Sequence, residues 1–181
     1  MQSINGNRLI IIGAGGHGKV VAETVLLKSE YNLIGFVDES IEKGTLLFNN
    51  LSCLGNIQDV LSGLIGADYF LVAIGNNSIR KKIYEQLAPI LKSAIVIHPS
   101  AVVSSSAIIN GGTVILANSV INAETIVSEN CVINTLSLVD HNSFIGGHTH
   151  ITQGTIIGSN VIVPEQHIFS LGDRIPSFSK L

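Results

Sequence analysis

Between about residues 8 and 98, short apolar runs alternate with segments that carry apolar residues at helical spacing. The first run, RLIIIGAG at 8–15, is continuously apolar and ends in glycine, which is typical of a strand buried on both faces of a parallel sheet. The segment HGKVVAETVLLKS at 17–29 has the spacing of a helix packed on that sheet. Further strands are predicted at 32–39, 69–77 and 93–98, and helices at 56–65 and 78–91. This order predicts a small open α/β sheet, a Rossmann-like domain over residues 1–98.

After Pro99 the pattern changes to a strict repeat of six residues. A helical face drifts at about 3.6 residues per turn and cannot keep a period of six, whereas a coil of short strands can. The sequence therefore predicts a parallel β-helix over residues 99–181. The repeated aliphatic positions are Val103, Ile109, Ile115, Ile121, Val127, Ile133, Val139, Ile145, Ile151, Ile157 and Val163. Four positions after these lie Ala107, Thr113, Ser119, Thr125, Cys131, Ser137, Ser143, Thr149 and Thr155, and then Val161.

Composition and charge narrow the possible partners. Of 181 residues, 46% are hydrophobic and 13% are charged, and the formal net charge is -3. A chain without an excess of positive charge is not expected to bind nucleic acid. No apolar run approaches the roughly 20 residues of a membrane span, and the N-terminus lacks the features of a secretory signal. We therefore expect a cytoplasmic protein without membrane insertion, in which Cys53 and Cys131 are reduced thiols.

A glycine-rich segment, GAGGHG at 13–18, lies between the first predicted strand and the first predicted helix. It fits the pattern G-x-G-x-x-G, and Asp38 lies about 20 residues further on, where dinucleotide-binding proteins place an acid that binds ribose. Taken alone, this pattern indicates NAD, but the sheet is too short for a complete dinucleotide fold. Backbone N–H groups at a helix N-terminus bind the phosphates of UDP equally well. A third interpretation is that the glycines only make a tight turn.

Polar residues also follow the third predicted strand, in the stretch AIGNNSIRKK. Asn76, Asn77 and Arg80 lie at the carboxyl end of that strand, where open α/β sheets bind ligands. An equally good interpretation is that Asn77 or Ser78 caps the next helix while Arg80 faces solvent.

Three of the six histidines, His141, His148 and His150, lie close together in the repeat region. A zinc ion would need three such ligands and an open position, which is one interpretation; exposed, inert histidines are a second, and catalysis is a third. If three repeats close one coil, residues 18 apart stack, so His141 lies between Ala123 and Ser159 on the outer wall, next to a corner.

Five segments, in this order, resemble the motifs of one known family: GAGGHGKVV, GFVDE, AIGNNSIRKKIYE, IHPSA and VDHNSFIG. The family comprises the sialic-acid O-acetyltransferases and the bacillosamine-type UDP-amino-sugar N-acetyltransferases, and the resemblance runs from about Arg8 to about Val163. It implies a left-handed β-helix of hexapeptide repeats, with three repeats to each triangular coil. It further implies a homotrimer that transfers acetyl from acetyl-CoA to a nucleotide-linked sugar, without a metal. N-acetylation of a UDP-4-amino-sugar is favoured over O-acetylation, and a related surface-glycan sugar is the alternative acceptor.

The resemblance assigns the N-terminal domain to the nucleotide of the UDP-sugar. It places the glycine-rich loop near the phosphates, the acids Asp38 and Glu39 near the uridine, and Asn76 among the substrate-binding residues. The loop residues with this role are Gly13, Gly15, Gly16, His17 and Gly18.

The resemblance also implies roles for residues of the β-helix. His141 matches the general base, and an imidazole suits this role because it takes up and releases a proton near neutral pH. His150 lines the same cleft near the acetyl group or the sugar, and a backbone N–H at Gly158 or Ser159 stabilises the oxyanion. His148 has no counterpart in the family.

The chain departs from the family pattern in ways that support a rival interpretation. Asn142 follows His141 where the family commonly has an acid, and Asp140 is expected to help only across a subunit boundary, because adjacent strand residues point to opposite faces. Ser159 replaces a glycine, and the repeat decays after Val163, so the coenzyme site could be incomplete. The rivals are a catalytically impaired protein that binds nucleotide sugars and an oligomeric scaffold without ligands.

Overall fold

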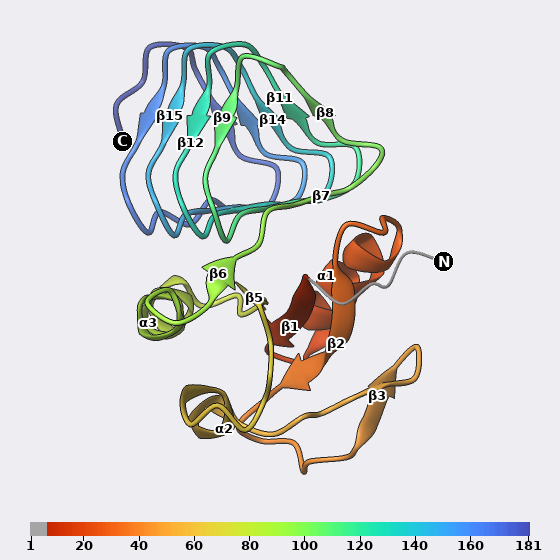
Figure 1. Ribbon diagram of the computed structural model, residues 1–181. Helices are drawn as coiled ribbons and strands as arrows, with labels where there is room; N and C mark the ends of the chain where they lie inside the picture. Colours follow the sequence, from red (N-terminus) through yellow and green to blue (C-terminus); the bar gives the residue numbers. More distant parts are fainter. Residues whose placement is uncertain (1–6) are drawn as a thin grey trace.

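The computed structural model describes residues 7–181, which form an α/β domain followed by a β-helix (Figure 1). The central sheet of the α/β domain is parallel, with the strand order β2-β1-β5-β6. Its strands are β1 (Arg8–Ile12), β2 (Asn32–Val37), β5 (Tyr69–Val72) and β6 (Lys92–Ser93), and its helices are α1 (Gly16–Leu26), α2 (Ile57–Leu61) and α3 (Asn77–Leu87). The sequence did not reveal the antiparallel hairpin of β3 (Leu46–Phe48) and β4 (Leu51–Ser52).

The strand β1 is buried on both faces, as its unbroken apolar run predicts. Leu9 and Ile11 belong to one core cluster with Val21 of α1, and Ile10 and Ile12 belong to another core on the opposite face. That second core includes residues of α2 and α3. The helix α2 is shorter than predicted and begins with a capping box, in which Asn56 and Asp59 satisfy each other's backbone N–H groups.

The C-terminal domain is the predicted left-handed β-helix, built of two-residue strands that stack in three parallel sheets. Each strand pairs with the strand 18 residues further on, so that Val96, Val114, Val132 and His150 form one column. The sheets have the orders β7-β10-β13-β16, β8-β11-β14-β17-β19 and β9-β12-β15-β18. The strands are β7 (Val96–Ile97), β8 (Val102–Val103), β9 (Ile108–Ile109), β10 (Val114–Ile115), β11 (Val120–Ile121), β12 (Ile126–Val127), β13 (Val132–Ile133), β14 (Leu138–Val139), β15 (Phe144–Ile145), β16 (His150–Ile151), β17 (Ile156–Ile157), β18 (Ile162–Val163) and β19 (Arg174–Ile175).

The repeat of six follows from what each position does in a coil. The aliphatic residues fill the interior, and from Ile115 to Val163 they are fully or almost fully buried. The small polar residues are buried as well, and each hydroxyl donates to the carbonyl oxygen 15 residues further on, as Ser119 does to Asn134 at 2.8 Å. The other donors in this ladder are Thr113, Thr125, Ser137, Ser143, Thr149 and Thr155. A Ser or Thr thus fits where a larger side chain would not and leaves no buried hydroxyl unpaired.

The corners of the coil also recur every six residues. From Gly112 to Phe178, one residue in each corner has a positive φ, between +55° and +80°. Glycine and asparagine tolerate this left-handed conformation best and occupy many of the corners.

The β-helix begins earlier than the sequence predicted. The predicted strand 93–98 is divided: β6 joins the α/β sheet, whereas Val96 and Ile97 pair with β10 as the first strand of the β-helix. The usual pattern of aliphatic and small residues decays after Val163, but the coil continues, because Phe169 is buried in the interior and β19 pairs with β17. Single bridges at Ile168 and Lys180 complete the pairing of that coil.

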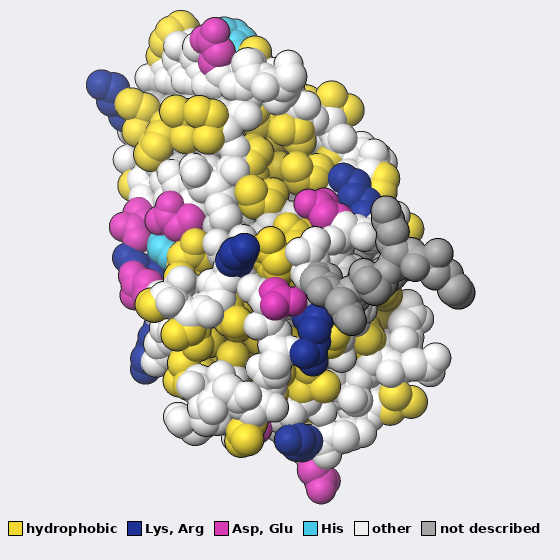
Figure 2. Space-filling model, in the orientation of Figure 1, with side chains coloured by type: hydrophobic (Ala, Val, Ile, Leu, Met, Phe, Trp, Pro, Cys, Tyr) yellow, Lys and Arg dark blue, Asp and Glu magenta, His cyan; other side chains and the backbone are white. Residues whose placement is uncertain are grey.

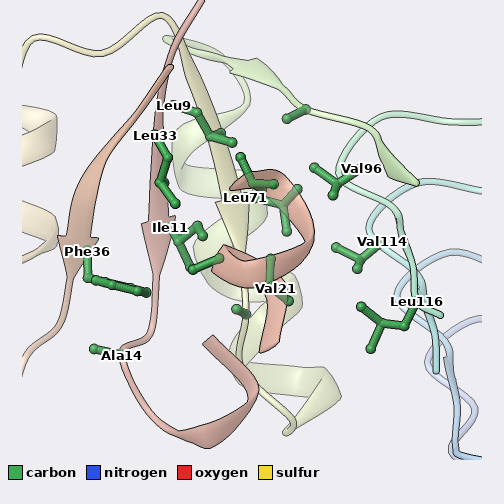
Figure 3. Close-up of a cluster of buried hydrophobic side chains, with 14 residues drawn as sticks. Leu9, Ile11, Ala14, Val21, Leu33, Phe36, Leu71, Val96, Val114 and Leu116 are labelled. Atoms are coloured by element: carbon green, nitrogen blue, oxygen red, sulfur yellow. The ribbon is translucent and has the colours of Figure 1, made fainter. Parts of the chain in front are cut away.

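The two domains share one apolar core. Val96, Val114 and Leu116, from the first coils of the β-helix, pack in the same cluster as Val21 of α1 and Leu71 of β5 (Figure 3). The helix α1 therefore covers one face of the sheet and also contacts β7. Cys53 and Cys131 are buried and free. Within residues 7–181, no helix is long and apolar enough to cross a membrane.

Candidate functional site

A cavity of about 420 Å³ opens at the carboxyl ends of β1, β2 and β5. This is the edge of an open parallel sheet where ligands bind. The glycine-rich loop, Asp38, Glu39 and the segment Ala73–Gly75 line it, together with apolar side chains of α3.

The glycines of the loop have two different roles. Gly13, at φ +99°, would place a Cβ 2.9 Å from the carbonyl oxygen of Ala73, and a Cβ on Gly18 would lie 2.1 Å from the carbonyl oxygen of Gly13. Close packing therefore demands these two glycines. A Cβ added at Gly15 or Gly16 would meet nothing within 4 Å, and both residues line the cavity. In addition, no side chain caps the N-terminus of α1. Free N–H groups at a helix N-terminus suit the oxygens of a phosphate.

The two acids predicted near the uridine lie at the wall of this cavity, and both also hold the protein together. Asp38 accepts from the N–H of Ala14 and from the N–H and hydroxyl of Ser40. Burial acts to raise the pKa of Asp38, but these hydrogen bonds outweigh it and hold the pKa below its usual value. Glu39 accepts from the N–H of Ile57, the first residue of α2.

Asn76, predicted to bind substrate, caps α3, because its Oδ1 accepts from the N–H of Ile79 at 3.0 Å. Asn77 does not cap the helix but donates to the carbonyl oxygens of Gln166 and His167 in the β-helix.

The expectation that Arg80 faces solvent is wrong, since this side chain is fully buried between the two domains. Its guanidinium donates to three carbonyl oxygens, those of Ile74, Asn130 and His148. Burial lowers the pKa of Arg80 to about 10, which leaves it charged at neutral pH. The residues that follow β5 therefore fasten the α/β domain to the β-helix.

His17 and His150 meet where the cavity approaches the β-helix. Their ring centroids are 6.1 Å apart and the rings are nearly parallel, at 24°. Burial, and then the positive charge of Arg80, lowers the pKa of each ring to about 4, so both are neutral at pH 7. Asn134 accepts the N–H of Thr135 through Oδ1, so its Nδ2 donates to Nε2 of His150, whose proton lies on Nδ1.

His148 lies at a corner of the coil, against the α/β domain. It is almost fully buried, its Nδ1 accepts from Nδ2 of Asn130 at 2.7 Å, and its Nε2 lies 3.8 Å from Glu129 and 3.7 Å from Glu165. Burial lowers the pKa of His148, against the opposing effect of the two carboxylates. These contacts give His148 a structural role between the domains.

His141 is the exposed histidine of the three. It lies in a turn, and its Nδ1 is 2.7 Å from Oδ1 of Asn142. If Nδ1–H donates to this oxygen, Nε2 carries a free lone pair.

Asp140, from which help for His141 is expected across a subunit boundary, contacts the backbone of His141 within the same chain. Oδ1 of Asp140 accepts the backbone N–H of His141 itself, within the same chain, and also accepts from Nδ2 of Asn122. The hydrogen bond from Asn122, and then that from His141, hold the pKa of Asp140 below its usual value. A carboxylate can accept from its own neighbour in this way because the chain turns at His141, so the alternation of an extended strand does not apply.

The two amides proposed for the oxyanion both have partners in this structure. The N–H of Gly158 belongs to the β ladder and donates to the carbonyl oxygen of Ile175. The N–H of Ser159, one coil beyond His141, donates to Oγ of Ser177 at 3.1 Å. Of the two, only the N–H of Ser159 can be freed by the rotation of a side chain.

The structure does not bring the three histidines together. His148 faces Glu129 and Glu165, His150 faces His17, and His141 is exposed at another corner. Among residues 7–181, no group of three or more His, Cys, Asp or Glu side chains is arranged to hold a metal ion.

Sequence reasoning missed Glu124, whose Oε2 accepts from Nδ2 of Asn142. The sequence could have predicted this contact, because Glu124 and Asn142 are 18 positions apart and residues 18 apart stack in successive coils. Ser177 was missed for another reason, because it lies in the segment after Val163, where the pattern of the repeat decays.

One face of the β-helix carries a column of exposed apolar side chains. In the sheet β9-β12-β15-β18, the outward residues of successive coils are between 37% and 54% exposed. Figure 2 shows apolar side chains over the face of the β-helix where Figure 1 places β9, β12 and β15. The column consists of Ile108, Ile126, Phe144 and Ile162.

The N-terminal domain matches a known domain family. Residues 8–87 match the family described as the PglD N-terminal domain. A UDP-N-acetylbacillosamine N-acetyltransferase of Bacillus subtilis (strain 168) is 38% identical over 97 residues, which are 52% of this chain and 44% of that enzyme. The aligned part is thus less than half of the length of this relative.

Solved structures match over both domains. The acetyltransferase domain of PglB from Neisseria gonorrhoeae FA1090 is 30% identical, with a TM-score of 0.76, over 97% of this chain and 96% of that chain. The same domain in complex with acetyl coenzyme A is 31% identical, with a TM-score of 0.72, over 97% and 95% of the two chains. PerB from Caulobacter crescentus, in complex with CoA and GDP-perosamine, supports the fold, with 24% identity and a TM-score of 0.70 over 94% and 91%.

Proposed function

Because this chain belongs to the family of left-handed β-helix acetyltransferases that comprises the sialic-acid O-acetyltransferases and the UDP-amino-sugar N-acetyltransferases, we propose that it acetylates a nucleotide-linked amino sugar with acetyl-CoA. A UDP-4-amino-sugar is the favoured acceptor, since the Bacillus relative is named for UDP-N-acetylbacillosamine. The similarity to a domain solved with acetyl coenzyme A supports the donor.

The single observation that carries the proposal is the position of His141. The ring is exposed at a corner of the coil, and its Nδ1 is 2.7 Å from Oδ1 of Asn142, so a proton on Nδ1 leaves Nε2 with a free lone pair. That is the arrangement a general base needs. No other histidine of residues 7–181 combines exposure with such a partner on one ring nitrogen and a match to the family's base.

The proposed reaction uses His141 as its base. The sugar amine attacks the carbonyl carbon of the thioester while Nε2 of His141 takes the proton that the nitrogen loses. The tetrahedral intermediate collapses with cleavage of the C–S bond, and the imidazolium returns the proton to the departing CoA thiolate. The N–H of Ser159 is the proposed donor to the oxyanion, after Oγ of Ser177 rotates away from it.

The cavity of the α/β domain is the proposed nucleotide site. Its open glycines, Gly15 and Gly16, and the uncapped N-terminus of α1 suit the phosphates, and the apolar wall suits the flat face of a base. His17 and His150 extend this site toward the β-helix, where the sugar would lie.

A homotrimer completes the proposal. His141 lies at a corner with solvent around it, so a site that excludes water needs a second surface. The column Ile108, Ile126, Phe144 and Ile162 gives each β-helix an apolar face that a neighbouring subunit can cover.

One observation favours the rival, a protein that binds nucleotide sugars without catalysis: the N–H groups of Gly158 and Ser159 both have partners. Calorimetric titration separates the two functions. The proposed enzyme binds both acetyl-CoA and a UDP-sugar, and Asp38→Ala weakens only the UDP-sugar, because Asp38 holds the loop at Ala14. Binding of the UDP-sugar without acetyl-CoA would favour the rival, and binding of neither would indicate a scaffold.

A further inference from the structure

Glu124 and Asn142 occupy the same corner position in successive coils. Both have left-handed backbones, at φ +57° and +58°, and the N–H of Asn142 donates to the carbonyl oxygen of Ala123 at 3.0 Å. The two side chains therefore leave the coil in the same direction, one above the other, and Nδ2 of Asn142 donates to Oε2 of Glu124. A left-handed corner favours asparagine or glycine over glutamate, so the backbone conformation does not explain why position 124 holds a glutamate.

We infer that Glu124 is a positioning residue that acts through Asn142 to hold His141 in the tautomer whose Nε2 accepts a proton. The inference rests on the proposed function, in which His141 is the base. It follows from what each group can donate. A carboxylate only accepts, so the amide of Asn142 must turn its Nδ2 toward Glu124 and its Oδ1 toward His141. An oxygen next to Nδ1 of His141 in turn requires the proton on Nδ1 and leaves Nε2 unprotonated.

Without the carboxylate of Glu124, the orientation of the Asn142 amide and the tautomer of His141 are no longer fixed. A glutamine at position 124 can accept from Nδ2 or donate to Oδ1, so the amide of Asn142 can flip. A flipped amide offers its NH₂ to the imidazole, which then carries its proton on Nε2 and cannot act as a base. Because Glu124 and Asn142 are exposed, their contact adds little to stability, and its effect is on orientation.

The first test reads the tautomer directly and needs no substrate. Long-range ¹H–¹⁵N correlation spectra of histidine-labelled protein identify which nitrogen of His141 carries the proton. We expect the Nδ1–H tautomer in the wild type and a mixture in Glu124→Gln. The double variant Glu124→Gln/Asn142→Asp should return to Nδ1–H, because the new carboxylate accepts from His141 directly while the new amide at position 124 donates to that carboxylate. The same tautomer populations in the wild type and in Glu124→Gln would overturn the inference.

The second test uses turnover. Glu124→Gln should lower kcat by about five- to tenfold at unchanged KM for both substrates, since only the fraction with free Nε2 is competent. The double variant should recover most of the loss, which a merely structural role would not allow. Glu129→Gln, at a partly exposed glutamate on another corner of the β-helix, is the matched control and should keep wild-type kcat. If the wild type is active and Glu124→Gln has the same kcat, the inference about Glu124 is wrong, but the proposed function stands. If the wild type is inactive, the proposed function itself is overturned.

Discussion

The imidazole of His17, at the N-terminus of α1, stacks on the imidazole of His150, in the strand β16, with 6.1 Å between the ring centroids. This contact joins the glycine-rich loop of one domain to the coil of the other. The proposed nucleotide site therefore reaches the β-helix at β16, whereas His141 lies at a different corner of the coil, between β14 and β15. Both rings are largely buried, and protonation of a buried ring is unfavourable, so the stability of the chain also depends on pH.

We predict that the free energy of unfolding falls as the pH drops from about 7 to 5. The pKa of His17 and of His150 is about 4 in the folded chain, against 6.5 for an ordinary histidine, because burial disfavours the charged form. Between pH 6.5 and 4 the unfolded chain therefore binds protons that the folded chain does not, and stability is lost on acidification. The pair accounts for about 2 to 4 kcal/mol of this loss between pH 7 and 5.

Urea denaturation at pH 7 and pH 5 measures this effect. Carboxylates also contribute to acid sensitivity, so the double variant His17→Gln/His150→Gln is the comparison. It should lose clearly less stability than the wild type between the two pH values. An equal loss in both proteins would mean that the two rings titrate normally.

Arg80 should be critical for holding the two domains together. In Arg80→Met the carbonyl oxygens of Ile74, Asn130 and His148 lose their donors in a buried place, at a total cost of at least about 3 kcal/mol. Calorimetry should record a melting temperature lower by roughly 6 to 12 °C. Lys82→Met, an exposed change two residues further along α3, should shift stability by no more than about 0.5 kcal/mol. A similar small shift for Arg80→Met would contradict the role assigned to it.

The apolar column of the β-helix should be the subunit interface. Phe144→Glu places a charge in the middle of this column and should convert the proposed trimer into monomers, because an unpaired charge is costly to bury. Sedimentation velocity measures the change. Leu64→Glu, at a side chain of the α/β domain that is 73% exposed, is the matched control and should leave the trimer intact. A wild-type monomer, or a trimer that tolerates Phe144→Glu, would contradict this assignment.

The sequence predicted the parts of the fold that depend on a one-dimensional period. Ile133 and Ile151 lie in the interior because every coil must present the same side chain at the same place. The divided strand 93–98 could have been found in the same way, because Ile97 lies six positions before Val103. Phe169 also keeps the period and is buried in the interior, although the residues around it lack the aliphatic and small pattern of the earlier repeats.

The roles of the individual histidines could not be predicted to the same extent. The period gives each histidine its place in the coil, but the packing of the α/β domain decides what covers it. Arg80 and Asn130 enclose His148, and His17 covers His150, whereas nothing among residues 7–181 covers His141. The contact from Glu124 to Asn142 is the exception, because both residues belong to the coil and their spacing of 18 alone brings them together.

The most direct test of the account is the turnover of the purified chain with acetyl-CoA and UDP-N-acetylbacillosamine, followed by the release of the CoA thiol and the mass of the sugar product. We expect CoA release that requires the sugar and equals the amount of acetylated product, with UDP-N-acetylglucosamine, which offers hydroxyls but no free amine, as the inactive control. His141→Ala should lower kcat by about 10² to 10⁴. No CoA release that depends on the amino sugar, or a His141→Ala variant that keeps most of the wild-type rate, would contradict the account.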